Sequence, residues 1–391
     1  MNVPKLRFKE FNDEYETIKL EDVAELTSSK RIYLSDYTDS GIPFYRGKEI
    51  SELKINKPVS DLLYISNEKY EEMKSKYGAP KENEILITGV GTLGNIYRIP
   101  NNEKFYFKDG NLIWLKSIKQ NPEYLEYNLE FNRKKLLDSA IGSTQKALTI
   151  AGLNKLSFNY PSKLEQSKIA KTMQLIDKKI NLQSKKIEDL KLFKMGTLDR
   201  FFNKNTQVSK SILSNYCICL TGKSKVDKVD PNGNYYIIDM GTVNSDGYIL
   251  KNKPTFCDSD LLSYGDLVMP KDDIGGGLII GKTGFIDEDN KYILGDHVYL
   301  IKSKNINSLY LHYQINSKYI NRKVKRKVTG SAQLGLKSGN ILNQEIFIYP
   351  ENEQLKIANI FNLLDKKIKL ENSKLNKLLE YKKGLMQSMF V

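Results

Sequence analysis

"YPSKLEQSKIAKTMQLIDKKI" (160–180) and "YPENEQLKIANIFNLLDKKI" (349–368) decide the architecture, because they are two copies of one segment. The Glu-Gln, Ile-Ala and Asp-Lys-Lys-Ile motifs of the two copies are each separated by 188 residues. The similarity continues as far as Gly196 and Gly384, and Phe202 and Phe390. The chain therefore contains an internal duplication, and its order is globular, helical, globular, helical.

Each copy predicts one long helix, because proline stands near its start and no proline follows for about forty residues. Apolar residues then recur with alternating spacings of four and three. They are Ile169, Met173, Ile176, Ile180, Ile187 and Leu190 in the first copy, and Ile357, Phe361, Leu364, Ile368, Leu375 and Leu378 in the second. This period is typical of a coiled-coil seam, and about 38 residues would form a rod of roughly 57 Å. We expect the two helices to pack on each other.

One polar residue interrupts each seam near its middle, Gln183 in the first helix and Glu371 in the second. If the helices pair antiparallel about a pseudo-twofold axis, these two residues meet and fix the register. The alternative is a locally hydrated turn of each helix with no pairing between the two side chains.

The globular halves also correspond, although they have diverged more than the helices. Residues 83–99 parallel 265–286, 110–116 parallel 295–302, 124–127 parallel 310–313, and 141–145 parallel 329–333. Alternating apolar stretches bounded by Gly, Asn and Asp predict short strands in mixed α/β or α+β domains. The predicted segments are a first domain at 1–158, a helix at 159–204, a second domain at 205–347 and a helix at 348–391.

"GGLIIGKTG" (276–284) matches the P-loop pattern G-x-x-x-x-G-K-[ST] of nucleotide-binding proteins. In the first copy, however, Asn95 occupies the lysine position. A P-loop also needs a helix behind its lysine, whereas 278–280 predicts a strand and the residues that follow predict a turn and another strand. We therefore expect no ATP binding by this chain, and the glycines predict a tight turn or a close backbone approach.

The 391 residues carry a formal net charge of +14, which favours an anionic partner. The two helical segments hold +9 of this charge, although a lysine-rich chain with a solvated surface would look similar. The beginning of the sequence has no apolar leader, and no window approaches a membrane span. Three cysteines, Cys217, Cys219 and Cys257, predict a reducing cytoplasm. The two histidines have no ligand-like spacing, so no metal site is expected.

Basic clusters precede each long helix, and each is followed by a Gly-Ser turn. They comprise Arg133, Lys134 and Lys135 in the first half, and Arg322, Lys323, Lys325, Arg326 and Lys327 in the second. The turns that follow contain Ser143 and Gln145, and Ser331 and Gln333. Basic side chains followed by N–H and hydroxyl donors suit phosphate oxygens, so these residues are predicted to contact a DNA backbone. The alternative is a solvated helix end.

With the duplicated "YP…EQ…IA…LDKKI" helices and the paired G-S-x-Q turns, essentially the whole chain resembles the specificity subunit of type I restriction–modification systems. The resemblance implies an α+β protein with two mixed α/β target-recognition domains in tandem, separated by two long helices that form an antiparallel coiled coil. Each domain would read one part of a split, asymmetric DNA site, and the helices would set the gap. A non-enzymatic coiled-coil scaffold without DNA specificity is the alternative.

The resemblance also implies that the chain is no catalyst and binds no cofactor itself. Two modification subunits would dock on it and methylate adenine with S-adenosylmethionine. Restriction subunits would use ATP and Mg for translocation and cleavage of the double-stranded DNA. A methylation-only complex without a restriction subunit remains an alternative.

Base contacts are predicted for polar residues at matching places in the two halves. They are Tyr45, Arg46 and Lys48 in "FYRGKEI", Asp239, Thr242 and Asn244 in "DMGTVN", and Lys271, Asp272 and Lys282 around the glycine loop. Arg or Lys would suit guanine, and Asn or Gln would suit adenine, in the major groove. The alternative for each residue is a role in the surface or in a turn.

Overall fold

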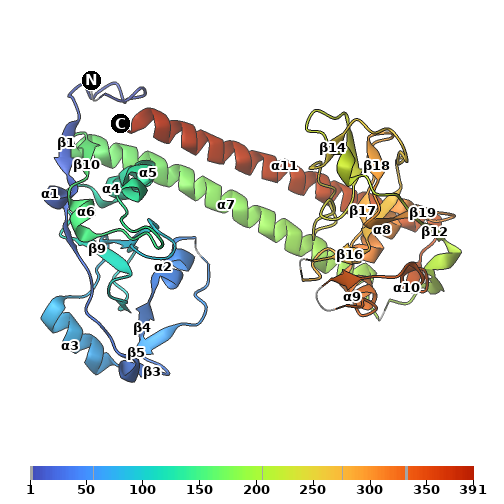
Figure 1. Ribbon diagram of the computed structural model, residues 1–391, viewed down its shortest axis with the longest axis horizontal. Helices are drawn as coiled ribbons and strands as arrows, with labels where there is room; N and C mark the ends of the chain where they lie inside the picture. The colour runs from blue at the N-terminus through green and yellow to red at the C-terminus, as the bar shows by residue number, and fades with distance from the viewer. Residues whose placement is uncertain (1–2, 56, 205, 275, 331–332) are drawn as a thin grey trace. The chain divides into compact units, whose positions relative to one another are not determined.

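The computed structural model describes residues 3–55, 57–204, 206–274, 276–330 and 333–391, and the chain divides into two compact units. Unit 1 consists of residues 1–182 and 375–391, and unit 2 of residues 183–374. Each unit combines a globular part with segments of two long helices, α7 (Lys163–Phe201) and α11 (Glu351–Met389) (Figure 1). No helix among the described residues is both long and apolar enough to cross a membrane.

Unit 1 contains two four-stranded sheets and a separate strand pair. The first sheet has the order β2-β9-β6-β7 and is antiparallel throughout; in the second, β3-β5-β4-β8, strand β4 runs parallel to β8. Strand β1 pairs with β10. The strands are β1 Glu16–Lys19, β2 Glu25–Thr27, β3 Tyr37–Thr38, β4 Ile42–Tyr45, β5 Leu63–Ile65, β6 Ile85–Thr88, β7 Ile96–Arg98, β8 Tyr106–Phe107, β9 Leu112–Lys116 and β10 Ser157–Tyr160. The helices of its globular part are α1 Leu20–Val23, α2 Gly47–Lys54, α3 Asn67–Tyr77, α4 Pro122–Phe131, α5 Arg133–Asp138 and α6 Ile150–Asn154.

Unit 2 repeats this plan. Its main sheet, β12-β19-β15-β17, is antiparallel; β13 runs parallel to β18 in the sheet β14-β13-β18; and β11 pairs with β21. The strands are β11 Ser209–Ile212, β12 Cys217–Thr221, β13 Tyr235–Ile238, β14 Pro254–Thr255, β15 Leu267–Pro270, β16 Asp272–Asp273, β17 Gly284–Phe285, β18 Tyr292–Leu294, β19 Val298–Ser303, β20 Leu334–Gly335 and β21 Glu345–Ile348. The helices of its globular part are α8 Ser308–Asn316, α9 Lys318–Lys325 and α10 Ser338–Leu342.

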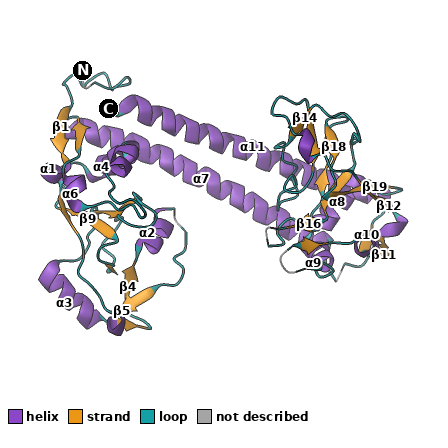
Figure 2. Ribbon diagram, viewed as in Figure 1, coloured by secondary structure: helices purple, strands orange, loops and turns teal. Residues whose placement is uncertain are grey.

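Both globular parts combine helices with mainly antiparallel sheets, and in unit 2 the strands β11 to β19 all precede α8, which confirms the predicted α+β class (Figure 2). The apolar stretches predicted as strands include 83–88, 111–116, 235–239 and 297–302, and these form β6, β9, β13 and β19. The strand expected at 278–280 is wrong: these residues form bends and a turn. Glycines with positive φ at Gly277 and Gly281 flank the run, so the backbone curves away from an extended path.

The Glu-Gln motif recurs because its glutamine fastens each long helix to its globular part. Gln166 in α7 accepts a hydrogen bond from the backbone N–H of Asn121 at 3.0 Å, and Gln354 in α11 accepts one from Asn307 at the same distance. Asn121 and Asn307 are the N-caps of α4 and α8, and each caps its helix with a 2.8 Å bond from a tyrosine N–H. The same side-chain contact is therefore made twice, once in each unit.

The predicted seam is the buried face of the helices, and within each unit the two helices run antiparallel. Ile169 and Met173 are buried in the core of unit 1, and Ile357 and Phe361 in that of unit 2. The leucines on other faces stay exposed. The hydrophobic cores thus run continuously from the sheets onto the helices, so neither helix is an independent arm.

The two polar residues of the seam meet as predicted. Gln183 Nε2 donates to Glu371 Oε2 at 2.7 Å and to the Glu371 carbonyl at 2.9 Å. Three lysines lie 3.2–3.3 Å from the other carboxylate oxygen. The hydrogen bond from Gln183, together with these lysines, lowers the pKa of the Glu371 carboxyl to about 2. A fully buried carboxylate is thereby kept charged inside the seam, where it sets the register.

Replacing Glu371 with glutamine is expected to destabilise the helix pair at neutral pH, and the loss should fade in acid. The pKa of the folded group lies below the ordinary glutamate value of about 4.3, so its stabilisation is complete above that value and disappears as the pH falls towards about 2. The difference in melting temperature between the native chain and E371Q, followed from neutral pH to about pH 3, measures this effect. E380Q, at an exposed position of the same helix, is the control. A difference that does not change with pH would contradict the prediction.

Candidate nucleic-acid interface

A groove of about 650 Å³ lies beside the first turn of α2 in unit 1. Helix α2 forms one wall, and the glycine loop at 90–92 with Asn111 forms another. Strand β4 ends at Tyr45 and the helix begins at Gly47, so the groove lies where the chain leaves the parallel strand pair. Arg46 and Lys48, both predicted to contact bases, line this groove.

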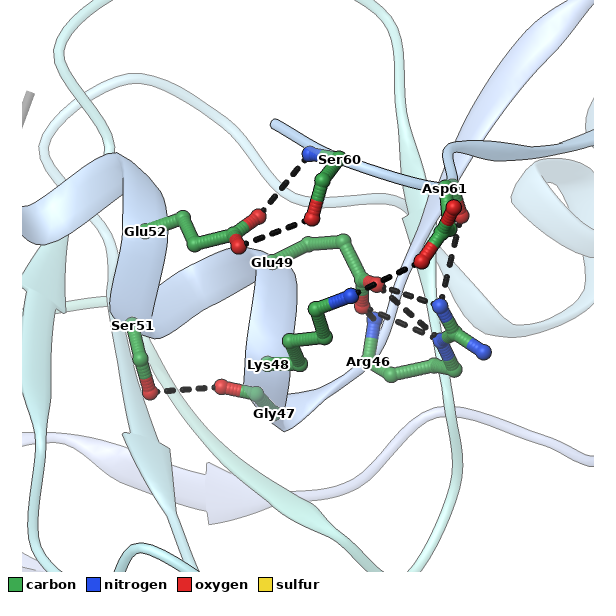
Figure 3. Close-up of polar contacts among 8 residues, drawn as sticks. All are labelled: Arg46, Gly47, Lys48, Glu49, Ser51, Glu52, Ser60 and Asp61. Carbon is green, nitrogen blue, oxygen red and sulfur yellow. Dashed lines mark hydrogen bonds and ion pairs between the residues drawn. The ribbon is translucent and has the colours of Figure 1, made fainter. Parts of the chain in front are cut away.

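The guanidinium of Arg46 is held in a fixed orientation. Its Nη2 donates to Glu49 Oε1 at 2.5 Å and to the Asp61 carbonyl at 3.3 Å, and its Nε donates to Glu49 Oε1 at 3.1 Å (Figure 3). Glu49 is fully buried and also accepts the backbone N–H of Arg46 at 2.7 Å, which caps α2. The hydrogen bond to the Glu49 side chain raises the pKa of Arg46, so the guanidinium stays charged at any physiological pH.

Lys48 differs from Arg46 because both its own side chain and that of its partner, Asp61, are exposed. Its ammonium lies 3.0 Å from Asp61 Oδ2, which lowers the pKa of Asp61 and raises that of Lys48. An exposed pair of this kind contributes little stability, so the lysine is free to exchange Asp61 for a phosphate oxygen. Tyr45 packs its ring against Phe105 at 5.0 Å and is only half-buried.

Arg133 supports the glycine loop from behind. Its Nη2 donates to the Leu93 carbonyl at 3.2 Å and to Asn95 Oδ1 at 3.0 Å, while Asn95 Nδ2 donates to Ser51 of α2 at 2.8 Å. The side chain predicted to contact phosphate therefore ties the loop to α2. Asn95, which occupies the lysine position of the P-loop pattern in the first copy, connects Arg133 to Ser51 through its side-chain amide.

The matching turn of unit 2 follows β13, which corresponds to β4. Asp239 is buried and pairs with Lys253 at 3.1 Å. The hydroxyl of Thr242, also buried, accepts from the Asp239 N–H at 2.9 Å and donates to its carbonyl at 2.7 Å. Asn244 Oδ1 accepts from two backbone N–H groups. All three side chains predicted for base contact thus shape the turn itself, and Asp239 and Thr242 are covered by protein.

The glycine loop of unit 2 does not have P-loop geometry. After Thr283 the chain enters strand β17, and the hydroxyl of Thr283 is buried 3.2 Å from His312 Nδ1. Lys282 is half-buried, with its ammonium 3.3 Å from the Asn316 carbonyl. Burial, and then the neighbouring charge of Lys325, lowers the pKa of Lys282 to about 8. Thr283 is thus not available to a bound metal, as a P-loop threonine would be.

Polar residues next to this glycine loop contact one another. Lys271 and Asp272 are half-buried between β15 and β20, and Asp272 Oδ2 lies 2.9 Å from His297 Nδ1. Asp239, Asp296 and His297 bring possible metal-ligand atoms within 4.8 Å of one another. Lys253 already neutralises Asp239, however, and this arrangement explains the cluster as an internal charge network.

The basic clusters divide into side chains that contact the protein and side chains for which the described residues supply no partner. Lys135 donates to the Ser157 carbonyl, Lys325 to Gly277, Lys327 to Asn340, and Lys323 pairs with Glu345. Lys134, Arg322 and Arg326 are exposed. Lys134, Arg322 and Arg326 are the members of the clusters best placed for phosphate, because the others would have to give up a contact first.

The glycines of the two Gly-Ser turns both have positive φ. Gly142 has φ +110° and Gly330 has φ +101°, and a Cβ at either position would lie within 2.4 Å of the carbonyl of Gln145 or Gln333. Only glycine fits there, which explains why it recurs. Ser143, Gln145 and Gln333 are exposed, and Ser331 lies outside the described residues.

Sequence reasoning missed Glu49 and Asp61, which orient the basic side chains of the groove. Glu49 had a detectable signal, since an acidic residue three positions after a helix N-cap is typical of a capping box. No sequence signal indicates Asp61, because its contacts with Arg46 and Lys48 depend on the path of the chain between them.

A family model for the type I restriction modification DNA specificity domain matches residues 12–192 and 205–381. These two matches cover most of the chain, one in each half. The chain belongs to this family. One relative, a type I restriction enzyme specificity subunit of Methanocaldococcus jannaschii, is 24% identical to this chain over 351 residues. The match covers 81% of this chain and 80% of that protein.

A Haemophilus influenzae protein named for the same class of subunit is 34% identical over 179 residues. This match covers 45% of the chain and 43% of that protein, so the chain matches less than half of this relative's length. Among solved structures, a type I restriction–modification S subunit from M. genitalium is similar with a TM-score of 0.65, at 15% identity and with coverage of 100% and 99%. A chain from a structure of type I complex assembly has a TM-score of 0.58 at 12% identity, with coverage of 97% and 98%. These likenesses establish the shared fold of the family.

Proposed function

We propose that this chain is the non-catalytic DNA-recognition subunit of a type I restriction–modification complex, with one part of a split site read by each globular domain. The observation that carries the proposal is a repeated scaffold with different loops. The main sheets have matching strand orders and Gly142 and Gly330 share a positive φ, yet β4 leads into α2 whereas β13 leads into a turn. Two readers of different sequences need this combination of a common frame and distinct contact elements.

The groove beside α2 is the proposed reading surface of the first domain, and exposed basic residues of α5 and α9 are the proposed backbone contacts. Phosphate contacts of this kind would position the protein, while contacts in the groove would carry the sequence information. The antiparallel helices would set the gap between the half-sites. Modification subunits would dock on the chain and supply S-adenosylmethionine, and restriction subunits would supply the ATP- and Mg-dependent steps, with the complex acting on cytoplasmic double-stranded DNA.

Mapping methyladenine in cells that express this chain with its modification subunits tests the proposal. The expected result is a split motif, two dissimilar half-sites separated by a constant gap, that is absent when the chain is omitted. Omission of the chain is the control for methylation by the host. Methylation without a motif, or a motif in one continuous block, would contradict the proposal and favour a scaffold without DNA specificity.

A further inference from the structure

A tyrosine, an aspartate and a lysine meet in unit 1 where its globular part contacts the long helices. Tyr127 Oη donates to Asp177 Oδ2 at 2.8 Å, and Lys382 Nζ donates to Asp177 Oδ1 at 2.6 Å. The same ammonium lies 5.4 Å from the centre of the Tyr127 ring. The three side chains come from α4, α7 and α11, so one carboxylate joins the globular part to both helices.

Unit 2 contains the same arrangement, atom for atom. Tyr313 Oη donates to Asp365 Oδ2 at 2.8 Å, and Lys194 Nζ donates to Asp365 Oδ1 at 2.5 Å. Lys194 lies 5.2 Å from the centre of the Tyr313 ring. These side chains come from α8, α11 and α7, so the two long helices exchange the aspartate and lysine roles between the units.

Unit 2 adds a fourth member to its cluster. Tyr248 Oη donates to Asp365 Oδ1 at 2.5 Å, and its ring lies 5.4 Å from Lys194. Tyr248 follows the turn that Asn244 organises, so the cluster reaches the loop region that corresponds to α2. The carboxylate of Asp365 thereby receives three donors from three parts of its unit.

Both clusters lie partly out of solvent, where directed polar contacts are stronger than on an open surface. The side chains of Asp365 and Lys194 are each 14% exposed, and those of Asp177 and Lys382 are 32% and 25% exposed. Burial raises the pKa of Tyr127 and Tyr313, with the nearby aspartate adding to the effect, so both tyrosines remain protonated donors. A carboxylate bound by both a hydroxyl and an ammonium restricts the relative placement of the three elements that supply them.

An apolar contact could hold these elements together without fixing their angle. A charged cluster costs desolvation, and replacing such a group by packed apolar residues is often neutral or stabilising. Its best-attested use is to select one arrangement among several with similar packing. The conservation of the same three residue types across two otherwise divergent halves fits a need for orientation.

We propose that Asp177 and Asp365 are positioning residues that fix the orientation of each recognition domain on the long helices of its own unit, and thereby restrict the gap length that the protein accepts. This inference rests on the proposed function. A domain freed to rotate on the helices would reach its half-site at more than one gap length. Removing the aspartate charge should therefore widen the range of accepted gaps.

The test uses the full complex with its modification subunits and DNA that carries the mapped half-sites at the native gap, one base pair shorter and one base pair longer. In D365N, the ratio of methylation at the native gap to that at the altered gaps is expected to fall about tenfold, the scale of one lost hydrogen bond to a charged group. D177N should act in the same direction. E188Q, at an exposed position of α7, is the matched control and should leave the ratio unchanged.

Y313F is the milder variant if D365N does not assemble, because it removes only the hydroxyl. A parallel loss of methylation at every gap length, with an unchanged ratio in both D365N and Y313F, would show that the cluster contributes only stability and would overturn the inference. The wild-type complex separates this outcome from failure of the proposed function. If the wild-type complex recognises no split site, the proposed function is wrong, whereas a wild-type gap preference that the variants retain rejects the positioning role alone.

Discussion

The Phe390→Ala variant is expected to lower the free energy of unfolding of unit 1 by about 3–5 kcal/mol, the usual cost of truncating a buried phenylalanine. Phe390 lies just beyond the end of α11 and is 3% exposed. Its ring stacks on Tyr124 with the centroids 5.3 Å apart, and it also lies 5.7 Å from Phe131. Losing this ring would leave a cavity between α4 and the last turn of α11.

Denaturant unfolding of the full chain, with hydrogen exchange to locate the change, measures this effect. Exchange should rise in α4 and in the last turns of α11, while the amides of unit 2 keep their protection. L192A is the control, because Leu192 is 55% exposed and its truncation should cost less than about 0.5 kcal/mol. A loss below about 1 kcal/mol in F390A would mean that the contact is not part of the core.

The same argument applies to Phe202, which corresponds to Phe390 in the duplication. Phe202 is fully buried, with its ring 5.6 Å from that of Tyr310. The sequence repeat alone aligned the two phenylalanines, and each occupies the place where a long helix meets its globular core. Both helix ends are therefore anchored by the same residue type.

The helices, their seam and the meeting of Gln183 with Glu371 could be predicted because they follow from properties local to the sequence. A 3.5-residue period identifies the buried face of a helix, and an internal duplication supplies the partner helix. A polar residue at one seam position then has only one counterpart in an antiparallel arrangement. Unit 2 places these two side chains 2.7 Å apart.

The glycine loop of unit 2 could not be predicted in this way. An apolar run at 278–280 favours a strand by composition, but its path depends on residues distant in sequence. A Cβ at Gly281 would lie 2.8 Å from Val324, and Asn321 donates to the Gly281 carbonyl at 2.7 Å. Helix α9 therefore shapes this loop, and nothing within the loop sequence reports that contact.

The candidate site was predicted only in part, since a polar loop residue can bind a ligand or hold the loop itself. Arg133 and Thr242 have suitable chemistry for DNA, yet each is used by neighbouring backbone groups. Arg46 also has protein partners, but it lines a groove. The difference lies in the surroundings of each side chain, which depend on the tertiary structure.

Arg46 is expected to determine one base of the first half-site. A guanidinium can donate two parallel hydrogen bonds to the O6 and N7 atoms of guanine, and such a pair is worth about 1–3 kcal/mol of discrimination. Glu49 holds the Arg46 side chain at Nε and Nη2, so little side-chain freedom is lost on binding. Nη2 exchanges its longer 3.3 Å contact with the Asp61 carbonyl for the base, and the Nη1 and Nη2 edge then faces guanine. We therefore expect this preorganised side chain to contribute sequence selectivity as well as affinity.

The R46A complex should bind the mapped site about 10–100-fold more weakly and accept any base at one position of the first half-site. Selectivity at the other half-site should stay unchanged. R46K should resemble R46A in its loss of selectivity, because lysine cannot form the bidentate contact. Binding to site variants with each base substituted in turn measures these losses.

K48A is the matched control, since Lys48 lies on the same groove but its exposed ammonium suits a phosphate. Its affinity should fall by a similar factor for all sequences, and the dependence on log salt should decrease by about one unit. E49Q should weaken selectivity at the same base as R46A, because Glu49 fixes the orientation of the guanidinium. If R46A instead lowers the affinity for every sequence equally, Arg46 is a backbone contact and the groove beside α2 does not read bases through it.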